Sequence, residues 1–182
     1  GKYSLTGKLI VNGVEIELLA EKDMRYVRMM DIGVLPVISK KAALGVSVYN
    51  YIIKPFSEDM SKSKREIILD AKRVMELLGV KNAEGIMNRS MASLSRNDLR
   101  AVMYSVAIST DPSILISYGP DKDMSESETE EMYKLLVKIC KIKNTAMLIL
   151  TSDTKFARKF SEKIYFIKND RLIEENEIEH SY

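Results

Sequence analysis

The sequence predicts an α/β protein with a parallel-sheet core, a helical middle part and an antiparallel β piece at the N-terminus. Helical and apolar stretches alternate from residue 94 onward, which is typical of parallel strands joined by helices. Residues 46–93 show only helical patterns. An Asn-Gly pair near the N-terminus, flanked by apolar runs, predicts a hairpin.

Residues 93–120 form the centre of the predicted fold, because they join a helix directly to a short apolar strand. Ser95 is expected to cap the helix, since its hydroxyl can accept a hydrogen bond from a backbone N–H of the first turn. Apolar residues recur at helical spacing as far as residue 107, and Asp111-Pro112 ends the helix. The apolar run 114–116 then predicts a strand that is buried on both faces.

The remaining elements are predicted from caps, turns and periodicity. In the N-terminal half they are a hairpin over 9–18, helices over 21–30 and 46–53, a strand over 32–38 broken by Pro36, a helix over 64–78 capped by Ser61 or Ser63, and a helix or turn over 82–90. In the C-terminal half they are a helix that begins with the capping box Ser125–Glu128, a fully apolar strand over 145–151, a helix over 154–161 and a third strand over 164–168, after which Asn169-Asp170 turns the chain into Leu172-Ile173.

Composition excludes several classes of function. The chain has 182 residues and a formal net charge of +2, which suits one domain and gives no strong reason to expect a nucleic-acid partner. Cys140 is the only cysteine and His180 the only histidine, so we expect no disulfide, no metal site of the zinc–histidine kind and no Ser-His triad. The single cysteine is compatible with a cytoplasmic protein, which we expect. Because no apolar run approaches the roughly 20 residues that span a bilayer, we expect no direct membrane insertion.

Several stretches resemble the nucleotide-binding domain of ATP-binding cassette (ABC) ATPases, most closely the peptide-importer branch. Leu94-Ser95 before a helix resembles the signature motif LSGGQ, and SILISYGP resembles the Walker B strand. GKYSLTGKLIVNGVEI, EKDMRYVRMMDIGVL and KREIILDAKRVMELLGVKN resemble the segments after the phosphate-loop helix, before the Q-loop and before the signature. The resemblance implies one domain of P-loop NTPase fold over 1–182, with a β part (1–45), a helical subdomain (46–93) and an α/β core (94–182).

The residues that carry the family's chemistry differ in this chain. The resemblance places the Mg²⁺-organising aspartate at Tyr118, the water-activating glutamate at Gly119 and the switch histidine at Ser152. A neutral phenol is a poor Mg²⁺ ligand, and glycine cannot act as a general base. We therefore predict no catalytic residues and no metal site. The sequence also contains no phosphate loop, G-x-x-x-x-G-K-[ST], which in the family would lie upstream of Gly1.

The signature remnant has two interpretations. Leu94 and Ser95 are candidate nucleotide-binding residues, but Arg96 and Asn97 replace the two glycines that let the backbone approach phosphate. Ser95 is therefore interpreted first as a helix cap. Arg96 and Arg100 are interpreted first as a solvated helix face, with an anion site at the helix start as the alternative.

Other conspicuous residues also have a structural interpretation beside a functional one. Tyr118 is expected at a half-buried strand end rather than stacked on a base, and Ser152-Asp153 is expected to form a turn or helix cap. The basic residues 39–41 and 61–65 are expected to form a charged loop and an exposed helix start, although 39–41 could also contact an acidic partner.

Three functions follow from these observations. The first, which we predict, is a catalytically silent ABC transporter-like domain, a pseudoenzyme without cofactor that partners another ABC-type ATPase domain or a transporter membrane subunit. Its location would be peripheral at the membrane, and the resemblance permits a dimer. The second is a fragment of a peptide ABC transporter ATP-binding subunit, which binds ATP and Mg²⁺ through a phosphate loop upstream of Gly1. The third is a binding module for acidic partners or nucleic acid. The sequence contains no basic stripe interleaved with aromatic residues that would support this function.

Overall fold

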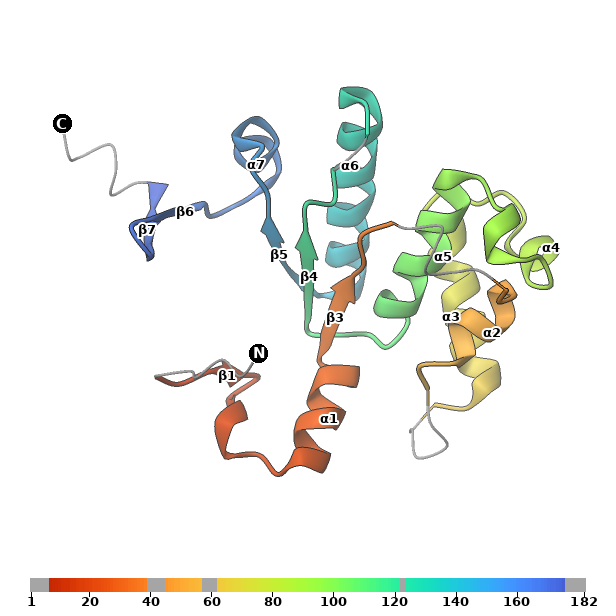
Figure 1. The fold of residues 1–182 in the computed structure, drawn as a ribbon, viewed down its shortest axis with the longest axis horizontal. Helices are drawn as coiled ribbons and strands as arrows, with labels where there is room; N and C mark the ends of the chain where they lie inside the picture. The colour runs from red at the N-terminus through yellow and green to blue at the C-terminus, as the bar shows by residue number, and fades with distance from the viewer. Residues whose placement is uncertain (1–6, 39–44, 57–61, 122–123, 176–182) are drawn as a thin grey trace.

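A computed structural model describes residues 7–38, 45–56, 62–121 and 124–175 of the chain. Its centre is a three-stranded parallel sheet in the order β3-β4-β5, formed by β3 (Ile32–Leu35), β4 (Ile114–Tyr118) and β5 (Ala146–Leu150) (Figure 1). The strands run in register, so that Val34, Ile116 and Leu148 lie side by side on one face. The predicted α/β class and the parallel core are therefore confirmed.

Helices α5 (Arg96–Ile108) and α6 (Glu126–Lys143) cover one face of this sheet (Figure 1). Leu35 and Leu115 point into that side and are 3% and 1% exposed. The approach of α5 is close at Gly33, where a Cβ atom would lie 2.7 Å from the Ala107 carbonyl oxygen. Gly33 therefore lets β3 pack directly against the backbone of α5.

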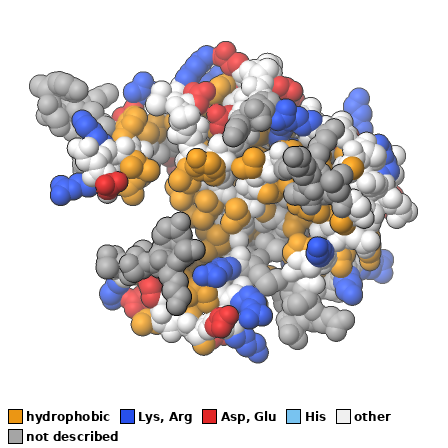
Figure 2. Space-filling view, viewed as in Figure 1, with side chains coloured by type: hydrophobic (Ala, Val, Ile, Leu, Met, Phe, Trp, Pro, Cys, Tyr) orange, Lys and Arg blue, Asp and Glu red, His pale blue; other side chains and the backbone are white. Residues whose placement is uncertain are grey.

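The opposite face of the sheet is open within the described part of the chain. Val34 is 60% exposed, Leu148 49% and Leu150 40%, and Figure 2 shows hydrophobic side chains gathered over the strands beside a hollow. The prediction that strand 114–116 is buried on both faces is thus wrong, and the fully apolar strand over 145–151 is also exposed on this side. An apolar run is compatible with a strand that is covered on one face or on both faces of the sheet. Only the elements that pack against the sheet decide between the two.

The two hairpins lie outside this sheet. Strands β1 (Ile10–Val11) and β2 (Val14–Glu15) confirm the Asn-Gly hairpin, although Ile16–Leu18 turns into a short 3-10 helix. Strand β6 (Tyr165–Lys168) pairs antiparallel with β7 (Arg171–Glu174).

The strand predicted over 164–168 is present as β6, but its expected place in the parallel sheet is wrong. The turn residues Asn169 and Asp170 both have positive φ, which closes a tight hairpin with the residues that follow. This local pairing sets β6 apart from β5, so β5 is an edge strand within the described residues.

The helical predictions are confirmed, with shifts at the ends. The helices before the central stretch are α1 (Glu21–Met30), α2 (Val48–Ile53), α3 (Lys64–Leu77), α4 (Ala83–Ile86) and a 3-10 turn at Met91–Ser93, and α7 (Thr154–Phe160) follows β5. Ser63 and Ser125 both make capping boxes, with Glu66 and Glu128.

None of the helices in the described ranges is long and apolar enough to cross a membrane. The division of the chain into a β part, a helical subdomain and an α/β core, with boundaries after residues 45 and 93, stays a prediction.

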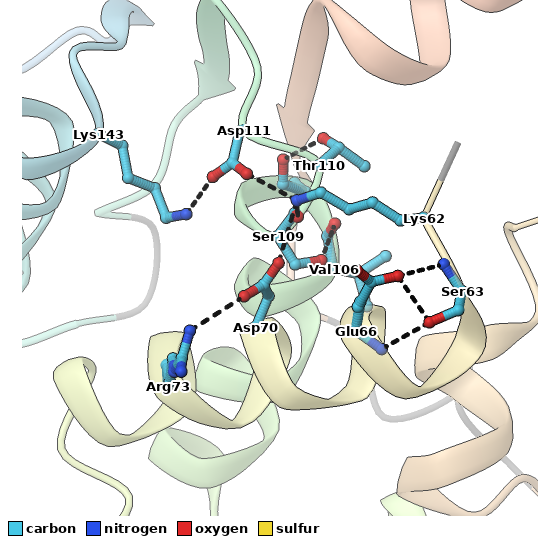
Figure 3. A network of polar contacts seen from close by, with 11 residues as sticks. Lys62, Ser63, Glu66, Asp70, Arg73, Val106, Ser109, Thr110, Asp111 and Lys143 are labelled. Atoms are coloured by element: carbon cyan, nitrogen blue, oxygen red, sulfur yellow. Dashed lines mark hydrogen bonds and ion pairs between the residues drawn. The ribbon is translucent and has the colours of Figure 1, made fainter. Parts of the chain in front are cut away.

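A polar network joins the start of α3 to the end of α5 (Figure 3). The Lys62 ammonium donates to Asp111 Oδ2 at 2.6 Å, to Asp70 Oδ2 at 3.0 Å and to the Ser109 carbonyl at 3.0 Å. The Lys143 ammonium at the end of α6 also contacts Asp111. The basic run 61–65 is therefore not simply an exposed helix start, because Lys62 is half-buried and fully paired. Residues 39–41 lie outside the described residues.

Candidate functional site

The candidate site lies at the carboxyl ends of β4 and β5, because ligands of parallel α/β sheets bind at this edge. Strand β4 ends at Tyr118 and β5 at Leu150, and these two residues are paired in register. The loops that leave the two strands carry the residues which the ABC resemblance places at catalytic positions. The structure therefore brings Tyr118, Gly119 and the loop with Ser152 to the same edge of the sheet.

Tyr118 and Gly119 form the end of β4. Tyr118 is 73% exposed, so the prediction of a half-buried strand end is wrong; the ring lies on the open face, where no described element covers it. Gly119 has a φ of +52° and its N–H donates to the Leu150 carbonyl at 2.8 Å. This conformation suits glycine because it has no Cβ.

The loop after β5 is held by hydrogen bonds of its own residues. Asp153 caps α7 by accepting from the Phe156 N–H at 3.1 Å, which confirms the cap interpretation. The Thr151 hydroxyl accepts from the Asp153 N–H at 3.0 Å and donates to the Asp121 carboxylate at 3.3 Å. Ser152 lies between them and is exposed.

The chemistry at this edge does not fit a magnesium ion. The end of β4 offers a phenol and a glycine, whereas Mg²⁺ prefers carboxylate and water oxygens. Among the residues that the structure describes, no group of three or more His, Cys, Asp or Glu side chains is placed to hold a metal ion. The nearby Asp121 carboxylate is engaged by Thr151.

The signature remnant begins helix α5. Leu94 is 2% exposed and part of the core. The Ser95 hydroxyl accepts from the Asp98 N–H at 3.1 Å and donates to Asp98 Oδ2 at 2.7 Å, which confirms its interpretation as a cap. A role of Leu94 and Ser95 in nucleotide binding stays a prediction.

A small cavity connects the start of α5 to the end of β4. Its lining comprises Val37, Ile38, Arg96, Arg100, Tyr104, Gly119 and Pro120, and its volume of about 10 Å³ has room for one water-sized group. Arg100 is only 9% exposed, so the expectation that Arg96 and Arg100 share a solvated face is wrong for Arg100. Burial lowers the pKa of the Arg100 guanidinium, and the neighbouring Arg96 lowers it further.

The burial of Arg100 was missed because charged residues are ordinarily placed on the solvent side of a helix. A signal was present in the sequence. Between Leu99 and Val106 the only polar residues besides Arg100 are Tyr104 and Ser105, so this stretch has no continuous polar face. A helix that is apolar all round is buried all round, and every residue from 99 to 105 is indeed buried.

Solved structures with this arrangement are ABC transporter cassettes. CbiO1 from Clostridium perfringens, described as part of the ABC transporter complex CbiONQ, matches with a TM-score of 0.77 over 95% of this chain and 70% of its own, at 19% identity. A dimeric bacterial ABC transporter cassette matches with a TM-score of 0.72 over 92% of this chain and 71% of its own, at 18% identity. The chain therefore has the fold of an ABC ATP-binding cassette.

Curated relatives point to the same class. Methionine import ATP-binding protein MetN 1 of Rhodopseudomonas palustris is 28% identical over 93% of this chain, and the lipoprotein-releasing system ATP-binding protein LolD of Blochmanniella floridana is 27% identical over 92%. The chain spans 44% of that MetN and 68% of that LolD. No protein-family model matches the chain. The chain is thus a distant homologue of ABC transporter ATP-binding proteins.

Proposed function

We propose that this chain is a degenerate ABC transporter ATP-binding domain, which does not hydrolyse ATP and acts as a structural or regulatory partner of a transporter or ATPase. The observation that supports the proposal is the end of β4, which presents an exposed Tyr118 followed by Gly119. The resemblance assigns these two positions to the metal-organising aspartate and the water-activating glutamate. Loss of a general base alone costs about 10²–10⁴-fold in rate. Loss of the metal-organising carboxylate adds to this deficit.

The partner is proposed from the homologues. CbiO1 is described as part of a transporter complex, and the second solved cassette is dimeric. A silent cassette can still occupy such a place, because docking depends on its surface and not on turnover. We therefore propose another ABC-type ATPase domain or a transporter membrane subunit as its partner, with a location at the cytoplasmic side of the membrane.

The experiment measures Mg·ATP binding by calorimetry and phosphate release with the 182-residue chain. We expect neither binding nor release above background. The matched variant carries Tyr118→Asp, Gly119→Glu and Ser152→His. Because the 182-residue chain contains no phosphate loop, this comparison is made in a longer protein that carries one, if the gene encodes it. Turnover by this variant and not by the wild type in that setting would assign the block to these three residues and support the proposal. Magnesium-dependent turnover by the wild type would refute it.

A second candidate is favoured by the open face of the sheet. Parallel sheets are normally covered on both faces, yet Val34, Leu148 and Leu150 are exposed here, and β5 has no outer neighbour among the described strands. One further strand beside β5, followed by a helix across the open face, would complete the sheet. In this second function the chain is part of a peptide ABC transporter ATP-binding subunit, and the completing segment lies upstream of Gly1 and carries the phosphate loop.

The two candidate functions make different predictions for a longer protein, if the gene encodes one. The second candidate predicts Mg·ATP binding that requires the upstream segment, together with strongly reduced exposure of Leu148 to hydrogen–deuterium exchange in that segment's presence. The first predicts no Mg·ATP binding with or without such a segment. Phosphate release at a normal ABC rate would contradict the first candidate in either setting.

A further inference from the structure

The hairpin β1–β2 is attached to the parallel sheet through the side-chain amide of its turn residue Asn12. The Asn12 Nδ2 group donates to Ser113 Oγ at 2.6 Å and to Asp31 Oδ1 at 3.3 Å. Asp31 directly precedes β3, and Ser113 directly precedes β4. In the described part of the chain no other hydrogen bond joins the hairpin to the sheet. The amide of Asn12 therefore anchors the hairpin at the amino ends of two sheet strands.

The residue after Asn12 leaves this amide open to attack by the backbone. Gly13 has no Cβ that would hinder its nitrogen from approaching Asn12 Cγ. Both residues are exposed, and nothing lies within 4 Å of the place where a Cβ of Gly13 would be. The Gly13 N–H has no hydrogen-bond partner among the residues that the structure describes. Both the attacking nitrogen and the water needed for a later step thus have access to the turn.

From this arrangement we propose that Asn12 is a site of spontaneous deamidation, which releases the hairpin from the sheet. The Gly13 nitrogen attacks Asn12 Cγ, and the new C–N bond closes a succinimide ring. The bond between Cγ and Nδ2 breaks, and Nδ2 leaves as ammonia with the proton of the Gly13 amide. Water then adds to a ring carbonyl and opens the ring to aspartate or isoaspartate. The sequence of steps consumes one water, releases one ammonia and needs no oxidant or reductant.

The folded turn controls the rate of this reaction. The attack requires the Asn12 side chain to leave Ser113 and Asp31 and to turn back onto Gly13. It therefore proceeds from a locally opened hairpin, whose population depends on how strongly the anchor holds. The product keeps the anchor broken, because a carboxylate cannot donate to Ser113 or Asp31 and is repelled by the charge of Asp31. This modification goes beyond the proposed function, since it needs neither a nucleotide nor a partner.

The first test incubates the wild-type chain in mildly alkaline buffer and maps its peptides by mass spectrometry, with enzymatic methylation to detect isoaspartate. We expect aspartate and isoaspartate to accumulate at Asn12. The matched control within the same chain is Asn169, which also has a positive φ in a hairpin turn but is followed by Asp170, whose Cβ hinders the attack. An Asn12 that stays intact after a peptide of residues 9–18 has fully deamidated overturns the proposal, as does equal reaction at Asn169.

The second test changes the anchor. Ser113→Ala removes one acceptor of the Asn12 amide and should accelerate deamidation about fivefold, or 1 kcal/mol, as expected for the loss of one hydrogen bond. Ser161→Ala, at an exposed serine after α7, is the control and should leave the rate unchanged. If Ser113→Ala does not fold, Asp31→Ala removes the other acceptor and serves the same purpose. A rate equal to that of the wild type shows that the anchor does not control the reaction and overturns that part of the proposal.

The third test measures the release itself by hydrogen–deuterium exchange in Asn12→Asp, which carries one of the two products. The Ile16 N–H donates to the Leu9 carbonyl at 2.8 Å within the hairpin, and its exchange should become faster than in the wild type. The amides of β4 serve as the control and should keep their protection. Equal exchange of the Ile16 N–H in the variant and the wild type would show that the modified hairpin stays attached.

Discussion

The Lys62 ammonium lies 2.6 Å from the Asp111 carboxylate, and this pair joins the residue before the cap of α3 to the turn that follows α5 (Figure 3). Partial burial acts to raise the pKa of Asp111, but the hydrogen bonds from Lys143 and Lys62 outweigh it and hold the pKa below its ordinary value. The pair also satisfies a carbonyl at the end of α5, because Lys62 donates to the Ser109 oxygen. The network thus connects the start of α3 to the ends of α5 and α6.

Replacement of Asp111 by asparagine should lower the free energy of unfolding by about 0.5–1 kcal/mol at neutral pH, as expected for a partly exposed ion-pair network. Asparagine tolerates the positive φ of 54° at this position, so the charge is removed without backbone strain. Because the folded pKa of Asp111 is depressed, its contribution is present above the unfolded pKa and is lost as pH falls through the folded value. Urea unfolding should therefore show the deficit shrinking below about pH 4.

The control for this prediction is Glu76→Gln on α3. Glu76 is exposed and makes no ion pair among the described residues, so its replacement should leave stability unchanged at every pH. Equal stability of Asp111→Asn and the wild type at neutral pH would contradict the assigned role of the network.

Loss of the Ser95 hydroxyl should cost about 1 kcal/mol in Ser95→Ala but only a few tenths in Ser95→Gly, because glycine is a tolerated N-cap and alanine is not. The reason is the hydrogen bond from the Asp98 N–H, at 3.1 Å, which the hydroxyl accepts. Urea midpoints measure both variants, with Ser125→Ala as a matched cap of α6. If Ser95→Ala were as stable as the wild type, the cap would contribute nothing to stability, and the interpretation of Ser95 as a nucleotide contact would be favoured.

A methyl group at residue 33 should destabilise the protein by about 1–3 kcal/mol, the usual cost of overpacking. The added Cβ of Gly33→Ala would lie 2.5 Å from Leu115 Cδ2 and 2.7 Å from the Ala107 carbonyl oxygen. The Leu115 side chain can change its rotamer to avoid the new methyl group, but the backbone of α5 at Ala107 cannot move away from it. The melting temperature measures the effect, and Val34→Ala on the exposed face serves as the control, with a change below about 0.5 kcal/mol.

The open face of the sheet should bind a hydrophobic fluorescent dye. Leu148→Thr should reduce this binding at little cost in stability, since Leu148 is 49% exposed and threonine suits a strand. Leu115→Ala, on the covered face, should instead cost about 2–5 kcal/mol. Unchanged dye fluorescence in Leu148→Thr would mean that another part of the protein covers this face.

Local interactions were predictable from the sequence. Ser63, Ser95 and Ser125 cap the helices that were expected to begin there, because a cap involves residues only three positions apart. The Asn-Gly hairpin was equally predictable. The order of these elements also carried the ABC resemblance, which the solved cassettes support at the level of fold.

The sequence by itself determined the α/β class, the helix starts and the absence of a phosphate loop, since these depend on residue types and short spacings. Only the tertiary structure decided that one face of the sheet is open, that β6 leaves the sheet for a hairpin with β7, and that Arg100 is buried. An apolar run cannot specify how many of its faces are covered, and an arginine cannot specify what packs against its helix. Both depend on elements that lie far away along the chain, and their packing, rather than local propensity, sets the burial of each side chain.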